Sequence, residues 1–272
     1  MDNSPPLISI ITVNFNGGEH LPKLLDTTAQ LLAMYPEIEH VIVDGASKDN
    51  SCALFESYRA QHGRVRYVSE RDKGIYDAMN KGVALSAGTW FIHLNSDDYA
   101  INFPAWGKAI ARMKAKKPGV LATDVPIMDD TDVIRYLPGK PLSPMHRRFG
   151  FHFPHQGTFF QRSVFEACGP YRLDVGYIAD KLYAFRVLDR YDAGQIDYLD
   201  DPVSVQKIGG VSSSSLLTPV KTVRLTLRLA GSGYCKDVLV RALLNLVYKL
   251  RLALHKEKKR SLAELCVGSQ QS

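Results

Sequence analysis

The sequence has few of the features that mark disulfide-rich, metal-clustered or membrane-spanning proteins. It holds only four cysteines in 272 residues, Cys52, Cys168, Cys235 and Cys266, with neither CxxC nor metal-ligand spacing. We therefore expect reduced thiols. No apolar run reaches the roughly 20 residues of a transmembrane helix. Residues 1–6 are polar and lead directly into an apolar stretch, so we expect neither a signal peptide nor a transit sequence.

Two further absences exclude whole classes of function. Residues 14–18, after the first apolar stretch, lack the GxGxxG spacing of a nicotinamide dehydrogenase. No nucleic-acid recognition motif accompanies the basic residues. What is present, 45% hydrophobic and 23% charged residues, is typical of a globular protein with one α/β domain and at most a small appendage. The net charge of +6 favours an anionic partner, which could be a nucleic acid, a phospholipid surface or a phosphorylated small molecule.

Apolar runs alternate with amphipathic stretches from residue 7 to residue 100, a pattern that indicates βαβ units and a parallel sheet. The expected strands are 8–14, 40–44, 65–69 and 89–94, and the expected helices are 21–35, 49–62 and 75–85. Beyond them we expect a helix at 103–116, strands at 120–123 and 133–137, a proline-rich loop, a helix at 177–190 and a strand at 195–206. Residues 219–260 read as helical and basic.

Two adjacent carboxylates follow the fourth expected strand, in the sequence Asn95-Ser96-Asp97-Asp98. Ligands of open α/β sheets bind at this carboxyl edge. A hard divalent ion takes oxygen ligands, often only one or two carboxylates, and leaves its other positions for phosphate and water. Asp97 and Asp98 meet this demand, although a strand-ending turn has the same composition.

Acidic residues also follow the second and third expected strands. Asp44 could accept hydrogen bonds from a ribose or a base, and Gly45 beside it allows close backbone approach. Asp72 stands among basic residues that could offset a diphosphate charge, namely Arg71, Lys73 and Lys81. A capped turn and a solvated charged turn are the alternatives at each place. Three acid-bearing strand ends at one edge favour a nucleotide-binding site.

Taken in order, four segments resemble the motifs of family 2 glycosyltransferases with the GT-A fold. They are residues 10–14, 43–49, 72–82 and 94–98. The resemblance is dense over 7–100, thinner to about 215 and absent beyond. It is closest to bacterial enzymes that build exopolysaccharide, colanic-acid-like or O-antigen repeat units. It implies an α/β fold of the GT-A type, with a mostly parallel central sheet flanked by helices. The GT-A domain would cover residues 1–215, with a nucleotide-sugar-binding half at 7–100 and an acceptor-binding half at 101–215. A basic amphipathic helical extension would follow over 216–272.

The resemblance also implies roles for the matching positions. The donor-binding set is Thr12, Asn14, Asp44, Ser47, Asp72, Asn80, Lys81, Asn95, Ser96 and Lys207. Asp97 and Asp98 would hold the divalent metal, Mn²⁺ or Mg²⁺. The family's metal motif usually begins with Asp, whereas this chain has Asn95. Because an amide supplies no charge, Asn95 is expected to touch the ribose or a metal-bound water.

The family places its catalytic base in an acidic pair on a helix of the second half. Here Ala179 replaces the first acid and Asp180 keeps the second. Asp180 would take the proton from the acceptor hydroxyl as that oxygen attacks the anomeric carbon and inverts it. Asp174 is the other candidate for the base. Asp180 could also be present only because the helix dipole favours an acidic residue near the start of a helix. His155 could orient the acceptor, although a lone histidine beside aromatics is more often a hydrogen-bonded core residue.

Two segments have open assignments. Residues 207–212 resemble the glycine-containing segment that closes over the donor, with Lys207 or backbone N–H groups reaching phosphate, but a plain Gly/Ser linker is the alternative. The basic extension would lie on an anionic membrane surface, or pack on the domain or another subunit, so a homodimer is compatible with the sequence.

The sequence therefore predicts an inverting, hexosyltransferase-like enzyme that transfers a sugar from a nucleotide-diphosphate sugar to an acceptor hydroxyl. We expect a role in cell-surface polysaccharide biosynthesis, in the cytoplasm or on the inner face of the plasma membrane. The acceptor would be a glycan or a lipid-linked glycan, and no nucleic acid is involved. The alternative is a catalytically silent nucleotide-sugar or glycan-binding module, which Asn95 and Ala179 keep open.

Overall fold

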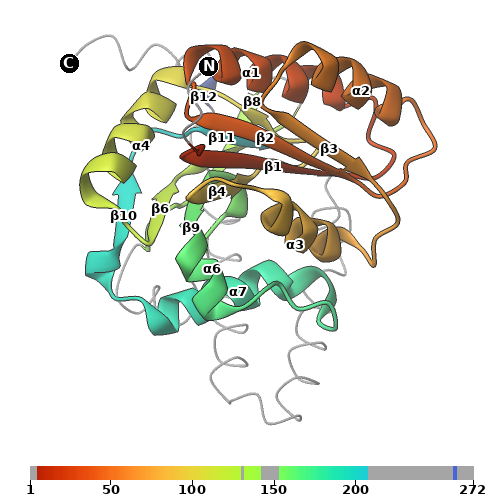
Figure 1. Cartoon of the computed structure of the whole chain (residues 1–272). Coiled ribbons are helices and arrows are strands. Elements are labelled where there is room, and N and C mark those ends of the chain that lie inside the picture. The colour runs from red at the N-terminus through yellow and green to blue at the C-terminus, as the bar shows by residue number, and fades with distance from the viewer. Residues whose placement is uncertain (1–4, 130–131, 142–152, 208–259, 262–272) are drawn as a thin grey trace.

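The structure, a computed structural model, describes residues 5–129, 132–141, 153–207 and 260–261 (Figure 1). A seven-stranded sheet runs through the described part in the order β10-β6-β9-β4-β1-β2-β3. Its strands are β1 (Ile8–Asn14), β2 (Ile38–Asp44), β3 (Val65–Ser69), β4 (Trp90–His93), β6 (Val120–Thr123), β9 (Thr158–Gln161) and β10 (Ile196–Leu199). Four of its six pairings are parallel, and β9 runs antiparallel between β4 and β6. The expectation of a mostly parallel sheet is confirmed.

Helices cover both faces of this sheet, as Figure 1 shows. They are α1 (Leu21–Met34), α2 (Ser51–Gln61), α3 (Ile75–Leu85), α4 (Phe103–Lys116), α6 (Arg162–Cys168) and α7 (Ala179–Arg190). Buried side chains of α1, α2 and α4 share a core with one face of the sheet. Those of α3, α6 and α7 share a core with the other face. Because both faces are covered, β1, β2 and β4 are buried along their whole length.

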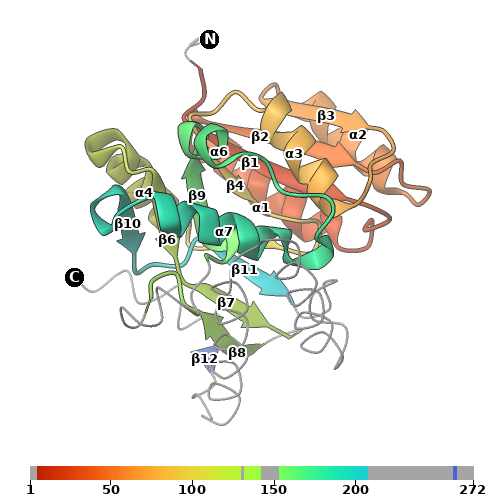
Figure 2. The ribbon, with the colours of Figure 1, turned by 90° about the horizontal axis from the view of Figure 1, so that it is seen from below.

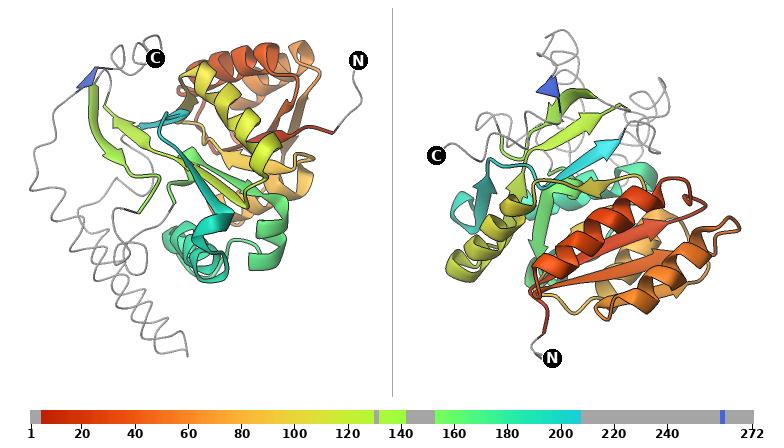
Figure 3. Two further views of the ribbon diagram at one scale, coloured as in Figure 1. Left: turned by 90° about the vertical axis from the view of Figure 1, so that its left-hand side faces the viewer. Right: turned by 90° about the horizontal axis from the view of Figure 1, so that it is seen from above.

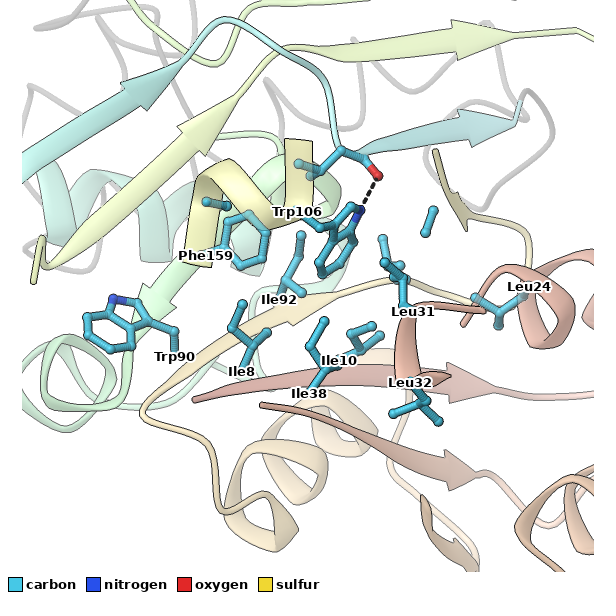
Figure 4. Close-up of a cluster of buried hydrophobic side chains, with 14 of the residues drawn as sticks. Ile8, Ile10, Leu24, Leu31, Leu32, Ile38, Trp90, Ile92, Trp106 and Phe159 are labelled. Carbon is cyan, nitrogen blue, oxygen red and sulfur yellow. Dashed lines mark hydrogen bonds between the residues drawn. The ribbon is translucent and has the colours of Figure 1, made fainter. Parts of the chain in front are cut away.

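Trp106 anchors the core on the α4 side of the sheet (Figure 4). Its ring is fully buried and meets Phe159 edge to face at 5.4 Å between centroids. Its indole Nε1 donates a hydrogen bond of 2.9 Å to the carbonyl of Val203. Burying a side chain of this size contributes about 1.5–3 kcal/mol, and the hydrogen bond satisfies its one polar group. Trp106 thus ties α4 to the segment that enters the second sheet.

The second sheet has five strands in the order β12-β8-β7-β11-β5. They are β5 (Tyr99–Ala100), β7 (Val125–Met128), β8 (Asp132–Leu137), β11 (Ser204–Lys207) and β12 (Arg260–Ser261). Figures 2 and 3 show this sheet to one side of the seven-stranded sheet. Since β5 directly follows the Asn95–Asp98 segment, the second sheet borders the expected metal-binding loop.

The structure corrects two expectations about single elements. Residues 195–206, expected to form one strand, form β10 and β11, which belong to different sheets. The break falls at Asp200, Asp201 and Pro202, where proline cannot continue a ladder. Arg260, expected in a helix, lies in β12, which pairs antiparallel with β8. The rest of the expected extension over 216–272 lies outside the described residues.

Two further observations concern disulfide bonds and membrane-spanning helices. Cys52 and Cys168, the cysteines within the described part, are free. No helix in the described ranges combines the length and the apolar character needed to cross a membrane.

Candidate active site

The carboxyl ends of β1 and β2 are joined side chain to side chain. Asn14 and Asp44 are register partners, and Asn14 Nδ2 donates to Asp44 Oδ1 at 2.8 Å. Ser47 completes this contact, because its hydroxyl donates to Asp44 Oδ1 at 2.5 Å and accepts the backbone N–H of Asn16 at 2.8 Å. The loops that follow the two strands therefore form one rigid corner.

Asp44 is the centre of this corner and is fully buried. Its Oδ2 atom accepts the backbone N–H of Ser47 at 2.9 Å and the hydroxyl of Ser69 at 2.8 Å. Burial alone would raise the pKa of Asp44, but the hydrogen bonds from Ser47, Asn14 and Ser69 hold the pKa below its usual value. The carboxylate is charged and serves the loop structure. A direct contact between Asp44 and a nucleoside stays a prediction.

Two glycines bring the neighbouring loops into close approach. A Cβ atom on Gly17 would lie 2.5 Å from Asn14 Oδ1 and 2.8 Å from Ser96 Oγ, so the loops after β1 and β4 touch there. A Cβ atom on Gly45 would lie 2.7 Å from Asp72 Oδ2, so the loops after β2 and β3 also touch. Four loops therefore converge at one edge of the sheet, as the sequence motifs predict.

Three members of the expected donor-binding set have polar side-chain atoms that contact other groups of the protein. The Thr12 hydroxyl is buried, donates to the Leu94 carbonyl at 2.7 Å and lies 2.9 Å from His40 Nε2. Lys81 Nζ lies 2.8 Å from Glu70 and donates to the Arg71 carbonyl at 2.9 Å. These contacts give both side chains partners within the protein, and a direct contact of either with a donor stays a prediction.

Asn80 is the third, and it holds the chain segment before α7 against α3. Its Nδ2 atom donates to the Tyr171 carbonyl at 2.8 Å, and its Oδ1 atom accepts the Tyr171 backbone N–H at 2.9 Å. Both hydrogen-bonding groups of the side-chain amide are thereby used. The geometry gives Asn80 a structural task, and its expected contact with the donor stays a prediction.

We expect Asn80→Ala to lower the free energy of unfolding by about 1–3 kcal/mol, since it removes two partly buried hydrogen bonds. Urea denaturation followed by circular dichroism measures this change. Asn50→Ala is the matched control, because Asn50 is exposed and makes no side-chain capping bond. Unchanged stability together with weaker nucleotide binding would return Asn80 to the donor site.

The Asn95–Asp98 loop turns one carboxylate inward and leaves the other accessible. Asp98 is 1% exposed, and its Oδ2 atom accepts the backbone N–H of Asn95 at 3.0 Å. Burial, and then the charge of Asp97, raise the pKa of Asp98 well above its usual value. Asp97 is only half-buried. The loop thus presents Asp97 to a ligand and holds Asp98 beneath it.

Asp97 and Asp98 fit a divalent cation that takes most of its ligands from elsewhere. No group of three or more His, Cys, Asp or Glu residues within the described ranges is arranged to hold a metal. A cation would relieve the repulsion between the two carboxylates. It would also give a partner to Asp98 Oδ1, which is buried without a hydrogen-bond donor among the described residues. One or two carboxylates, with substrate phosphates and water, suffice for Mg²⁺ or Mn²⁺. Asp97 is the more exposed of the two candidates.

Asp180 and His155 come together beside this loop. Asp180 lies in the first turn of α7, and His155 lies in the 3₁₀ turn His155–Gly157. His155 Nδ1 is 3.6 Å from Asp180 Oδ2, with the two side chains 17% and 18% exposed. His155 Nε2 is 3.3 Å from Asn95 Nδ2. The expected catalytic base and acceptor-binding residue are thus neighbours of the expected metal loop, and their roles stay predictions.

Lys207 ends β11 on the same side. β11 runs antiparallel to β5, with Val205 opposite Tyr99, and β5 directly follows the Asn95–Asp98 loop. This position agrees with a contact to a diphosphate held at the metal loop. The remainder of the expected closing segment, residues 208–212, lies outside the described residues.

Three aromatic residues of this region were not predicted from the sequence. Phe15 is 67% exposed although it follows a buried strand, and a Cβ atom on Gly45 would lie 3.2 Å from its ring. Tyr76 donates its hydroxyl to Asp180 Oδ1 at 3.0 Å. His93 is fully buried, and burial and then His155 lower its pKa well below the usual value. An aromatic between two asparagines, at Phe15, is the one local signal among them.

Comparison with known proteins agrees with this arrangement. The model of the family described as glycosyl transferase family 2 matches residues 9–170. A PGL/p-HBAD biosynthesis glycosyltransferase of Mycobacterium bovis is 31% identical over 176 residues, which cover 64% of this chain and 67% of the relative.

Solved structures share the fold at low sequence identity. S. aureus TarS in complex with UDP-GlcNAc has a TM-score of 0.64 at 15% identity, covering 87% of this chain and 71% of that one. A mannosyltransferase of Pyrobaculum calidifontis in complex with GDP-Man and Mn²⁺ has a TM-score of 0.62 at 16% identity, covering 93% of this chain and 82% of that one. These similarities establish a GT-A fold for the chain.

Proposed function

The chain belongs to glycosyl transferase family 2, and we propose that it transfers the sugar of a nucleotide-diphosphate sugar to an acceptor hydroxyl with inversion of the anomeric centre. Residues 1–215 would form the transferase domain and residues 216–272 a basic extension. The described geometry supports a donor at the carboxyl edge of the large sheet, next to Asp97. It supports an acceptor on the side of Asp180.

One observation carries the proposal. Three buried side-chain oxygens at this edge have no hydrogen-bond donor within the described ranges: Asn14 Oδ1, Asn95 Oδ1 and Asp98 Oδ1. Buried acceptors are seldom left unpaired, because each costs about 1–3 kcal/mol. The hydroxyls of a ribose, the N–H group of a base and a cation are partners of the right kind. Asn14 ends β1, and Asn95 and Asp98 lie in the loop after β4, where a nucleotide would lie.

The donor side also has an aromatic surface. Phe15 is exposed beside Gly45, and a planar base gains from packing on such a ring. The Asp72 carboxylate also lies close to Gly45 and would be available to the base or the ribose. We infer that Phe15 and Asp72 flank the nucleoside, with Asn14 and Ser47 shaping the corner beneath it.

Asp97, assisted by Asp98, would hold a divalent cation, which when bound neutralises the departing diphosphate. A neighbour in fold is described in complex with Mn²⁺, and this supports a metal in general. Lys207 would add a positive charge from β11. Asn95 would supply a neutral hydrogen-bonding group where an acid is usual.

Asp180 would act as the general base. Its carboxylate takes the proton of the acceptor hydroxyl while that oxygen forms the new bond to the anomeric carbon, and the bond to the nucleoside diphosphate breaks on the opposite face. His155, 3.6 Å away, is placed to orient the acceptor oxygen. Burial of the site against Tyr76 and His93 limits the access of water, which would otherwise take the acceptor's place.

We extend the proposal to a cell-surface role, with a glycan or a lipid-linked glycan as acceptor. A relative is named as a glycosyltransferase of PGL/p-HBAD biosynthesis, which supports a biosynthetic role. The lysines and arginines near the end of the sequence favour an anionic surface. They support a peripheral position at the inner face of the membrane. A homodimer is also compatible with the sequence.

A thermal-shift screen tests the donor site. The purified protein is heated with UDP, GDP, dTDP or CMP compounds, with and without Mn²⁺, and with the matching nucleosides as controls. One nucleotide is expected to raise the melting temperature by roughly 5–10 °C at about 100 times its dissociation constant. The rise should need Mn²⁺ and should be small for the nucleoside alone.

Turnover of the sugar donor that binds then separates the two classes of function. Transfer to an acceptor, or slow hydrolysis of the donor, supports the enzyme. Binding without any turnover would show a silent nucleotide-sugar module. No shift with any nucleotide would contradict the proposed donor site.

A further inference from the structure

The carboxylate of Asp180 is contacted from two sides by residues far away in the sequence. The Tyr76 hydroxyl donates to Oδ1 at 3.0 Å, across 104 positions of the chain. His155 Nδ1 lies 3.6 Å from Oδ2. Neither residue belongs to α7, which carries Asp180. The direction of the carboxylate is therefore fixed by two other elements as well as by its own helix.

Each of these two residues is joined to a donor-site loop. Tyr76 is the second residue of α3, directly after the turn in which Asp72 Oδ1 accepts the Gly74 backbone N–H at 2.8 Å. Gly74 has φ of 111°, a backbone conformation that side chains disfavour, so this turn calls for glycine. His155 contacts Asn95 at 3.3 Å. The base is thus connected to the Asp72 turn and to the metal loop.

The Tyr76 hydroxyl can only donate to the carboxylate. Burial, and then the negative charge of Asp180, raise the pKa of Tyr76 far above its usual value. The hydroxyl therefore keeps its proton and is the donor in this hydrogen bond. Its ring packs beside Tyr171, with 5.8 Å between centroids, which holds the hydroxyl in place.

We propose that Tyr76 is a positioning residue that aims the Asp180 carboxylate at the acceptor hydroxyl, with His155 as a second support. This inference rests on the proposed role of Asp180 as the base. As a consequence, the orientation of the base is coupled to the donor site. A donor that orders the Asp72 turn and the Asn95–Asp98 loop would also fix the orientation of the Asp180 carboxylate. Tyr76 itself transfers no proton.

Tyr76→Phe tests the inference, because it removes the hydroxyl and keeps the ring. Tyr171→Phe is the matched control, since the Tyr171 hydroxyl is buried in the same cluster but has no hydrogen-bond partner among the described residues. We expect Tyr76→Phe to lower kcat by about 10- to 100-fold, as misplacement of a reacting group does. KM for the donor should stay within about twofold, and Tyr171→Phe should leave kcat near the wild-type value.

The pH profile supplies a readout that packing alone would not change. A carboxylate that loses a hydrogen-bond donor takes up a proton more readily, so the acid limb of the kcat profile should move to higher pH in Tyr76→Phe. His155 and Tyr171 are titratable groups of the described part that also face Asp180. Both are kept in this variant. His155→Gln should also lower kcat, and it serves as the second variant if Tyr76→Phe folds poorly.

The outcomes separate this inference from the function on which it rests. Wild-type kcat and an unmoved acid limb in Tyr76→Phe, with Asp180→Asn inactive, would overturn the positioning role alone. Full activity of Asp180→Asn would overturn the base assignment and the positioning role with it. Equal losses in Tyr76→Phe and Tyr171→Phe, with lowered melting temperatures in both, would show that the hydroxyls only stabilise the cluster.

Discussion

Replacing Asp180 by Asn is expected to lower the rate of sugar transfer by about 10²- to 10⁴-fold while nucleotide binding stays unchanged. The amide oxygen of Asn can still accept the hydrogen bond from Tyr76, which is 3.0 Å long in the native protein. An amide cannot take a proton from the acceptor, so the chemical step alone suffers. Steady-state transfer assays give the rate, and the thermal shift with the nucleotide gives the binding.

Asp174→Asn is the matched control for this experiment. Asp174 is 65% exposed on its side chain and pairs with Arg172, and the partner guanidinium lowers the pKa of Asp174. A surface pair of this kind contributes little to stability. If Asp174→Asn were the inactive variant, the base would be Asp174. If Asp180→Asn lost both transfer and nucleotide binding, Asp180 would support the fold or the donor site instead.

The second large effect is expected at Asp97. Asp97→Ala should lower activity by about 10²-fold or more and should abolish the part of the nucleotide thermal shift that depends on Mn²⁺. The reason is that Asp97 is the accessible carboxylate of the loop, whereas Asp98 is 1% exposed. Activity measured over a range of Mn²⁺ concentrations, together with the thermal shift, checks both effects.

Asp200→Ala is the control for Asp97. Asp200 is 87% exposed on its side chain and contacts only Lys140 among the ion pairs of the described part, so its removal should leave the response to Mn²⁺ unchanged. An unchanged Mn²⁺ response in Asp97→Ala would remove Asp97 from the metal site. Loss of the Mn²⁺ response with full activity would show that transfer proceeds without the metal.

Local pattern predicted most of the elements that support the site. The bounds expected for β1, β3, α3, α4 and β6 are those of the structure. Uniformly apolar runs and clear amphipathic periods carry this information within a few residues. The prediction was wrong for residues 195–206, which looked like one strand. The two aspartates and the proline at 200–202 were the missed sign of a break.

Other elements of the second half were not predicted. β9 and α6 lie in a stretch where the sequence analysis placed only a loop. β9 is four residues long, and its inclusion between β4 and β6 is set by pairing with both. A strand this short has too few residues for a period to show. Its neighbours, and not its own sequence, decide that it is a strand.

The sequence by itself determined the family, the sheet edge and the acidic loops of this protein, because motifs and apolar periods are local. Only the tertiary structure decided what each polar side chain does. It paired Asp44 with Asn14, Ser47 and Ser69, turned Asn80 to the backbone of Tyr171, and brought Tyr76 to Asp180. The physical reason is that a hydrogen bond joins atoms within about 3 Å of each other in space. A local sequence pattern therefore cannot predict a contact between residues that are 104 positions apart.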